Sequence, residues 1–107
     1  MISLDDEISG SIESEVNRVC CRVFEKYSID QLMEMVRGSE NVYLLLHRDD
    51  REFVDIYVSN NGVDSSEFIA VPVPKRFAVL EPDKNYFEIT LKANIALALR
   101  GERDFHL

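Results

Sequence analysis

The segment LLLHRDDREFVDIYV, residues 44–58, holds the side chains of this sequence that are best suited to chemistry. His47 is followed by Asp49, Asp50 and Glu52, and an imidazole among carboxylates is a donor set for a metal ion or for acid–base catalysis. The segment joins two apolar stretches, so we expect a β-hairpin with these residues at its tip. Side chains at a hairpin tip spread apart into solvent, which favours solvated turn residues over a metal or catalytic site.

His47, Arg48 and Asp49 also match the start of the catalytic loop of protein kinases. That loop needs an Asn five positions after its Asp to hold a metal ion, and Val54 stands there instead. There is no G-x-S-x-G motif, and the 4 glycines are scattered singly, which argues against a phosphate-binding loop. The sequence therefore predicts a protein that is not an enzyme and has neither a metal site nor a cofactor.

Length and composition predict a single domain over residues 1–107. A chain of 107 residues with 46% hydrophobic and 30% charged residues is an ordinary globular composition. The longest apolar run, Val42 to Leu46, is far shorter than a membrane span. The start, MISLDDEISG, is acidic, unlike the basic opening of a signal peptide. We therefore expect a cytoplasmic location and no membrane association.

The 2 cysteines, Cys20 and Cys21, are adjacent in the sequence. Neighbouring cysteines strain a mutual disulfide, and two thiolates do not complete a tetrahedral zinc site. We expect a buried Cys20 with a more exposed Cys21 beside it, and no redox or metal role.

The net charge of −8 is concentrated in two segments. Residues 1–15 carry five acids and no base, and residues 40–67 carry seven acids against Arg48 and Arg51. Such a chain is repelled by the phosphate backbone, so direct nucleic-acid binding is not expected. The acidic run Asp5-Asp6-Glu7 also has a structural explanation, since acids stabilise the start of a helix.

Two helices are expected before the sheet. The first follows a stripe at helical spacing, made by Ile8, Ile12, Val16, Val19, Val23 and Tyr27. Ser3 and Asp6 resemble a capping box, but Gly10 weakens the first turns, so the regular helix is expected near Ser11. The second helix lies in SIDQLMEMVRG, with Ser28 and Gln31 as its capping box and Gly38 at its end.

A hairpin and further strands follow. NVYLLLH is continuously apolar and predicts a strand covered on both faces. FVDIYVS alternates, which predicts Val54, Ile56 and Val58 on the helix side and Phe53, Asp55 and Tyr57 on the outer side. NNG at 60–62 predicts a tight turn. EFIAVPV predicts a third strand ended by prolines at an edge or bulge, and RFAVLE a fourth.

Residues 84–100 fit both a helix and an alternating strand, and the Ala- and Leu-rich second half favours the helix, with Asp83 and Gly101 at its ends. The fold class is therefore α+β. It comprises two N-terminal helices, a three- to four-stranded antiparallel sheet, and a C-terminal helix packed on one sheet face.

Acids beside aromatic residues on an outer sheet face suit the recognition of a basic protein surface. The predicted partner-binding residues are Asp49, Asp50, Glu52, Phe53, Asp55, Tyr57, Asp64 and Glu67. The leading hypothesis is an immunity-type inhibitor, monomeric or weakly dimeric, that occludes the nucleic-acid-binding surface of one basic partner such as a nuclease toxin. The alternatives are a homodimeric secretion or assembly chaperone, and a phage-borne inhibitor of a host nucleic-acid-binding defence protein. An ordinary solvated sheet face explains the same pattern without a partner.

Overall fold

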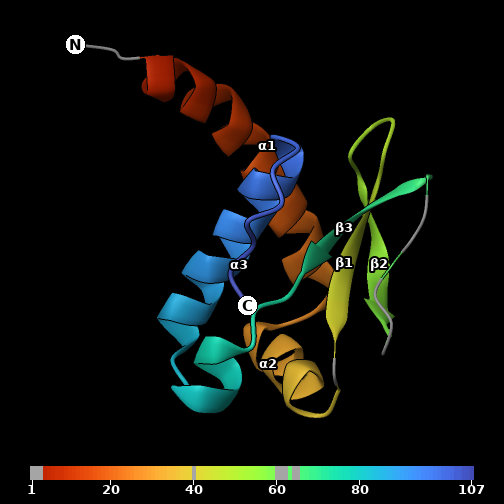
Figure 1. Cartoon of the computed structure of the whole chain (residues 1–107), viewed down its shortest axis with the longest axis vertical. Coiled ribbons are helices and arrows are strands. Elements are labelled where there is room, and N and C mark those ends of the chain that lie inside the picture. The colour runs from red at the N-terminus through yellow and green to blue at the C-terminus, as the bar shows by residue number, and fades with distance from the viewer. Residues whose placement is uncertain (1–3, 40, 60–62, 64–65) are drawn as a thin grey trace.

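The computed structural model describes residues 4–39, 41–59, 63 and 66–107, with the side chains described from residue 12 onward. The elements are α1 (Leu4–Lys26), α2 (Ile29–Arg37), β1 (Val42–His47), β2 (Phe53–Val58), β3 (Phe68–Pro72), the π-helical turn η1 (Arg76–Leu80) and α3 (Lys84–Leu99). Figure 1 shows α1 and α3 on one side of the sheet and α2 at one end. The predicted α+β fold class is confirmed.

The helix α1 carries the predicted apolar stripe. Val16, Val19, Cys20 and Val23 are all buried. The helix already begins at Leu4, so the expectation of a start near Ser11 is wrong and Gly10 lies within the helix. Ser3, the predicted cap, lies outside the described residues.

Capping residues set the limits of α2 and α3 as the sequence predicts. The Ser28 hydroxyl accepts a hydrogen bond from the Gln31 N–H, and the Gln31 side chain accepts one from the Ser28 N–H. The Asp83 carboxylate accepts the N–H groups of Asn85 and Tyr86 at the start of α3. After its end, Gly101 adopts a φ of 78°, a left-handed conformation that glycine reaches without strain.

The helical interpretation of residues 84–100 is confirmed by the burial pattern of α3. The buried positions follow helical spacing, and Ile89, which the alternative strand would have placed on the same face as Phe87, is 58% exposed. The buried side chains of α3 are Phe87, Leu91, Asn94, Ile95, Ala98 and Leu99.

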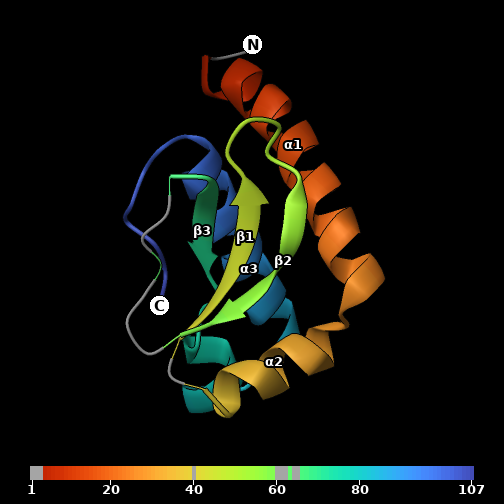
Figure 2. The same cartoon turned by 90° about the vertical axis from the view of Figure 1, so that its right-hand side faces the viewer.

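The sheet has the strand order β2-β1-β3, with both pairings antiparallel. Val42, Leu44 and Leu46 of the central strand are buried against the helices. Tyr43 and Leu45 on the other face are only half-buried. Figure 2 looks onto this face and shows none of the described helices in front of the strands. The prediction that this strand is covered on both faces is therefore wrong, and the sheet has one open face.

The predicted alternation of β2 holds only in part. The pairing register shifts between Leu45 and Leu46, so Phe53 lies opposite Leu46 and packs against the core instead of facing outward. Val54, predicted to face the helices, is 39% exposed. Ile56 does pack against the core, whereas Val58 at the strand end is 51% exposed.

The predicted fourth strand, RFAVLE, is instead the turn η1. The N–H groups of Lys75 and Arg76 donate to the Leu107 carbonyl of the C-terminal tail, and those of Val79 and Glu81 donate within the turn, to the carbonyls of Lys75 and Arg76. Ala78 is buried, and its carbonyl accepts a hydrogen bond from Arg37 Nε at 2.8 Å. The third strand does end at Pro72 on a sheet edge, as predicted. The predicted turn at 60–62 lies outside the described residues.

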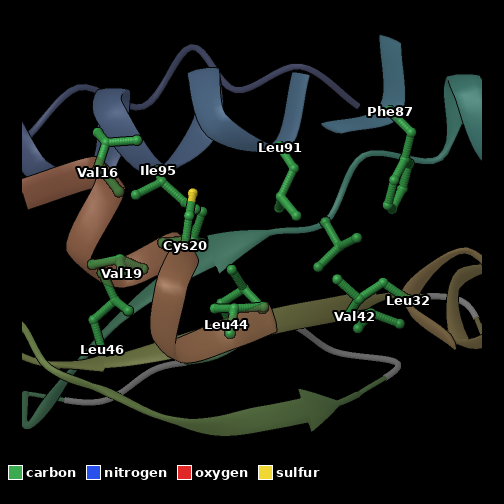
Figure 3. Close-up of a cluster of buried hydrophobic side chains, with 14 of the residues drawn as sticks. Val16, Val19, Cys20, Leu32, Val42, Leu44, Leu46, Phe87, Leu91 and Ile95 are labelled. Atoms are coloured by element: carbon green, nitrogen blue, oxygen red, sulfur yellow. The ribbon is translucent and has the colours of Figure 1, made fainter. Parts of the chain in front are cut away.

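One apolar core joins the helices to the buried face of the sheet. Figure 3 shows Leu91 and Ile95 of α3 pointing toward the layer that holds Cys20 of α1 and Leu44 of β1. Leu44, Leu91 and Ile95 are fully buried. Burying side chains of this size stabilises the fold by roughly 1.5–3 kcal/mol each.

Asn94 is a buried polar residue that fastens the C-terminal tail to this core. Its Nδ2 donates to the carbonyls of Pro72 and His106 at 2.9 and 2.8 Å, and its Oδ1 accepts the His106 N–H at 2.8 Å. Phe105 of the same tail packs against the core. A single side chain therefore links α3, the end of β3 and the tail.

We expect Cys20→Ser to be more destabilising than Cys21→Ser. Cys20 is 5% exposed, and burial raises the pKa of its thiol to about 11, whereas Cys21 is exposed. A buried hydroxyl without a partner costs roughly 1–3 kcal/mol, while the Cys21 change should stay within about 0.5 kcal/mol. Urea unfolding measures both, and equal losses would contradict the assignment of Cys20 to the core.

Asn94→Ala should lower the free energy of unfolding by about 1–3 kcal/mol, because it removes three partly buried hydrogen bonds to the main chain of Pro72 and His106. The exposed Asn85 on the same helix provides the matched control, Asn85→Ala. Hydrogen exchange of the His106 amide should accelerate in the first variant alone. Unchanged protection of that amide would show that the tail is held by other contacts.

Candidate functional site

The hairpin loop between β1 and β2 is closed by main-chain hydrogen bonds. The His47 N–H donates to the Glu52 carbonyl at 2.8 Å and the Arg51 N–H to the His47 carbonyl at 2.7 Å. Arg51 has a φ of 59°, a left-handed conformation that costs a non-glycine residue roughly 1–2 kcal/mol. The Asp50 carboxylate accepts the Glu52 N–H at 2.9 Å, so one of the predicted acids also holds the loop in shape.

The helix α1 holds this loop from the side. Arg51 Nη1 lies 2.9 Å from Glu15 Oε2, in a partly buried ion pair. Arg18 donates to the Asp50 carbonyl at 3.2 Å and lies 3.7 Å from Glu52 Oε1. Glu52 is therefore paired within the protein, and the loop is docked on α1 instead of projecting freely.

Side chains of Asp55 and Lys26 bond to main-chain groups on the outer edge of β2. The hydrogen bond from the Ser59 N–H to the Asn41 carbonyl sets the ladder alternation, which points the Val54 carbonyl and the Ile56 N–H away from β1. Lys26 Nζ donates to the Val54 carbonyl at 3.4 Å, and the Ile56 N–H donates to Asp55 Oδ1 at 2.8 Å. Figure 2 shows α1 running alongside this strand.

The Asp55 carboxylate also accepts a 2.7 Å hydrogen bond from the Tyr27 hydroxyl, and Lys26 Nζ lies 3.7 Å away. The Tyr27 hydrogen bond, followed by the Ile56 N–H, lowers the pKa of Asp55. The same hydrogen bond raises the pKa of Tyr27, because losing its proton would place a second negative charge beside Asp55. Asp55 therefore has a structural task whether or not it contacts a partner.

The predicted partner-binding residues do not form one cluster. Asp49 and Asp50 are exposed on the hairpin loop, and Glu67 lies beside that loop, because its carbonyl accepts the Arg48 N–H at 2.9 Å. Tyr57, 46% exposed, lies toward the other end of β2, roughly 15 Å away at the strand rise per residue. Phe53 is engaged in the core, and Asp64 lies outside the described residues.

The His47 ring contacts the Phe68 ring edge-on, with centroids 5.7 Å apart. Among the residues that the structure describes, no group of three or more histidines, cysteines and acids is placed to hold a metal ion.

A cavity of about 790 Å³ lies between β3 and the end of α3, and sequence reasoning missed it. Among the described residues, its charged lining comes from two arginine pairs, Arg48 with Arg51 and Arg100 with Arg103, and from one acid, Glu102. The two arginines of each pair are three residues apart in the sequence, and this spacing is the sequence signal that could have pointed to a basic site. Nothing local in the sequence shows that the two pairs share one cavity.

The Tyr27–Asp55 hydrogen bond should contribute at most about 0.5–1.5 kcal/mol, toward the lower end because both groups are solvent-accessible. Since the pKa of Asp55 is lowered on folding, this contribution is present above its ordinary value of 3.8 and is lost as the pH falls through the folded-state pKa. A double-mutant cycle of Tyr27→Phe and Asp55→Asn measures it by urea unfolding at several pH values. Tyr57→Phe, on the open sheet face, is the control. A coupling energy that persists after acidification would contradict the assignment.

No family model and no solved structure matches this chain. Within the described residues, no helix has the length and apolar character needed to cross a membrane. An uncharacterized protein of Archaeoglobus fulgidus is 47% identical over an alignment of 87 residues, which covers 75% of this chain and 78% of the archaeal protein. The chain therefore belongs to the same family as this archaeal protein.

Proposed function

We propose that this protein binds another protein through the open face of its sheet and acts by occlusion without catalysing a reaction. The observation that carries the proposal is the exposure of Tyr57, 46%, on a sheet face that no helix covers in the described part of the chain. Tyr43 lies beside it in the paired strand. Tyrosine is among the residues that most often anchor protein interfaces.

Charge indicates the kind of partner. The chain carries a net charge of −8, and Asp49, Asp50 and Glu67 are exposed acids at the loop end of the same sheet. Such groups accelerate encounter with a basic surface and orient it. In its most concrete form, the protein is a cytoplasmic immunity-type inhibitor of a basic nuclease-like toxin. The acids occupy the surface meant for phosphates and Tyr57 anchors the complex. A phage-borne inhibitor of a nucleic-acid-binding defence protein would use the same surface.

A homodimeric chaperone is the second candidate, because β2 exposes Val54 and Val58 as well as Tyr57. Exposed apolar side chains favour association, and Val58, opposite Val42, adds apolar surface on the other face of the strand from Tyr57. Lys26 and Asp55, however, hold the outward main-chain groups of Val54 and Ile56, which opposes dimerisation by strand pairing along β2. Light scattering distinguishes the candidates, since the inhibitor is expected to be monomeric and the chaperone dimeric.

The inhibitor hypothesis predicts association that slows as salt rises, because attraction between opposite charges is screened over roughly 8 Å at physiological ionic strength. Asp49→Lys with Asp50→Lys should slow association with the captured partner. Tyr57→Ala should act mainly on dissociation and cost roughly 2 kcal/mol or more. Surface-based kinetics at two salt concentrations, with a partner captured from cells of the source organism, measures these effects.

Tyr86→Ala is the matched control, because Tyr86 is 55% exposed but lies on α3, beside η1. Its binding kinetics should equal those of the parent protein. Association that does not depend on salt, together with a Tyr57→Ala variant that binds like the parent, would exclude the open sheet face as the interface.

A further inference from the structure

The second edge of the sheet, along β3, differs from the edge along β2. The Val73 N–H donates to the Val42 carbonyl at 2.8 Å, and the Arg48 N–H donates to the Glu67 carbonyl at 2.9 Å. These two bonds fix the alternation of the ladder between them. The main-chain groups of Phe68, Ala70 and Pro72 therefore point away from β1, toward the outside of the sheet.

Side chains cover only part of this edge. The Pro72 carbonyl accepts Asn94 Nδ2 at 2.9 Å, and the Phe68 carbonyl accepts Arg48 Nη2 at 3.1 Å. Proline has no N–H to donate. In the described part of the chain, the outward N–H of Phe68 and both main-chain groups of Ala70 have no protein hydrogen-bond partner. Three main-chain groups, two donors and one acceptor, thus remain open on β3, and the Phe68 carbonyl, which lies between the two donors, is held by Arg48.

These open groups face the cavity of about 790 Å³. Phe68 and Ala70 line one wall, and the end of α3 with the following tail, including Phe105, lines the other. Its size falls within the range of roughly 300–1,000 Å³ that is usual for ligand sites. An added strand would lie about 4.7–4.9 Å from β3, on the side where the cavity opens.

The charged side chains of the cavity indicate which kind of ligand it would bind. Arg48 holds the Ser66 and Phe68 carbonyls, and Arg51 is paired with Glu15, so both are fixed in the wall. Arg100 and Arg103 are exposed, and in the described part of the chain neither has an acidic partner within 4.0 Å. In a chain with a net charge of −8, this local excess of guanidinium groups favours carboxylates.

We propose that the β3 edge binds an extended acidic segment of a partner protein by strand addition. The main chain of the segment would pair with Ala70 and the Phe68 N–H. Its alternate side chains would place carboxylates at Arg100 and Arg103 and apolar groups against Phe105. This site lies along the outer edge of β3, whereas Tyr57 lies on the open face at β2. It would bind an acidic partner segment, whereas the open face would bind a basic partner surface.

The test uses a fluorescein-labelled, end-capped hexapeptide of alternating Glu and Val, a matched peptide with Lys in place of Glu, and fluorescence anisotropy at low salt. The Glu peptide should bind about tenfold or more tightly than the Lys peptide. Arg100→Glu with Arg103→Glu should weaken it by about tenfold or more. Arg22→Glu on the exposed side of α1 reverses one charge outside the cavity, as each single cavity substitution does within it, and should bind like the parent.

Strand pairing is tested separately from charge. Ala70→Pro removes the outward N–H at a position where an edge strand tolerates proline, and N-methylation of alternate peptide amides blocks pairing without changing charge. Both changes should weaken the Glu peptide by about tenfold, and the amide signals of Phe68 and Ala70 should shift on binding. Thermal unfolding confirms that each variant is folded. The proposal is overturned if N-methylation has no effect, if citrate displaces the peptide at equal concentration, or if Arg22→Glu weakens binding as much as the cavity variants.

Discussion

A sheet of three strands has one strand paired on both sides and two edges, and this constraint organises the molecule. β1 bonds to β2 through its odd-numbered residues and to β3 through its even-numbered residues, and its buried face meets the helices. Unpaired main-chain groups on an edge strand invite other chains to pair. Several contacts in the rest of the structure therefore involve the outward main-chain groups of those two edge strands.

The two edges are treated differently. At β2, Lys26 at the end of α1 bonds to the Val54 carbonyl. Tyr27, which follows the helix, bonds to Asp55, and the Asp55 carboxylate accepts the Ile56 N–H of its own strand. At β3, Asn94 fixes the strand end to the tail, but the middle of the strand opens onto an arginine-lined cavity. In a chain with an excess of acid, four arginines thus line the cavity onto which the open main-chain groups of β3 face. The acidic loop and Tyr57 lie on other parts of the same sheet.

Local signals predicted the helices and the hairpin because each depends on neighbours in the chain. The Ser28–Gln31 capping box, the Asp83 cap and Gly101 all act within a few residues, and all are observed. The shift that turned Phe53 inward is set by pairing with Leu46, which a period-two pattern in one strand does not contain. The predicted fourth strand is a turn whose main-chain groups bond within the segment, while the distant C-terminal tail accepts the Arg76 N–H at its start. Of the candidate site, the exposure of Tyr57 was predictable, but the arginine cavity joins segments half a chain apart.

The division of β1 between odd and even residues also limits how this family can diverge. Deleting one residue inside β1 would shift the residues on one side of the deletion by one position. Each shifted residue would then bond to the other neighbouring strand, and a core side chain such as Leu44 would turn to the open face. Length variation in the loop between β1 and β2 would disturb only the local contacts of that loop with α1. The length of β1 is therefore more constrained than the length of the loop, because β1 sets the register of both edge strands.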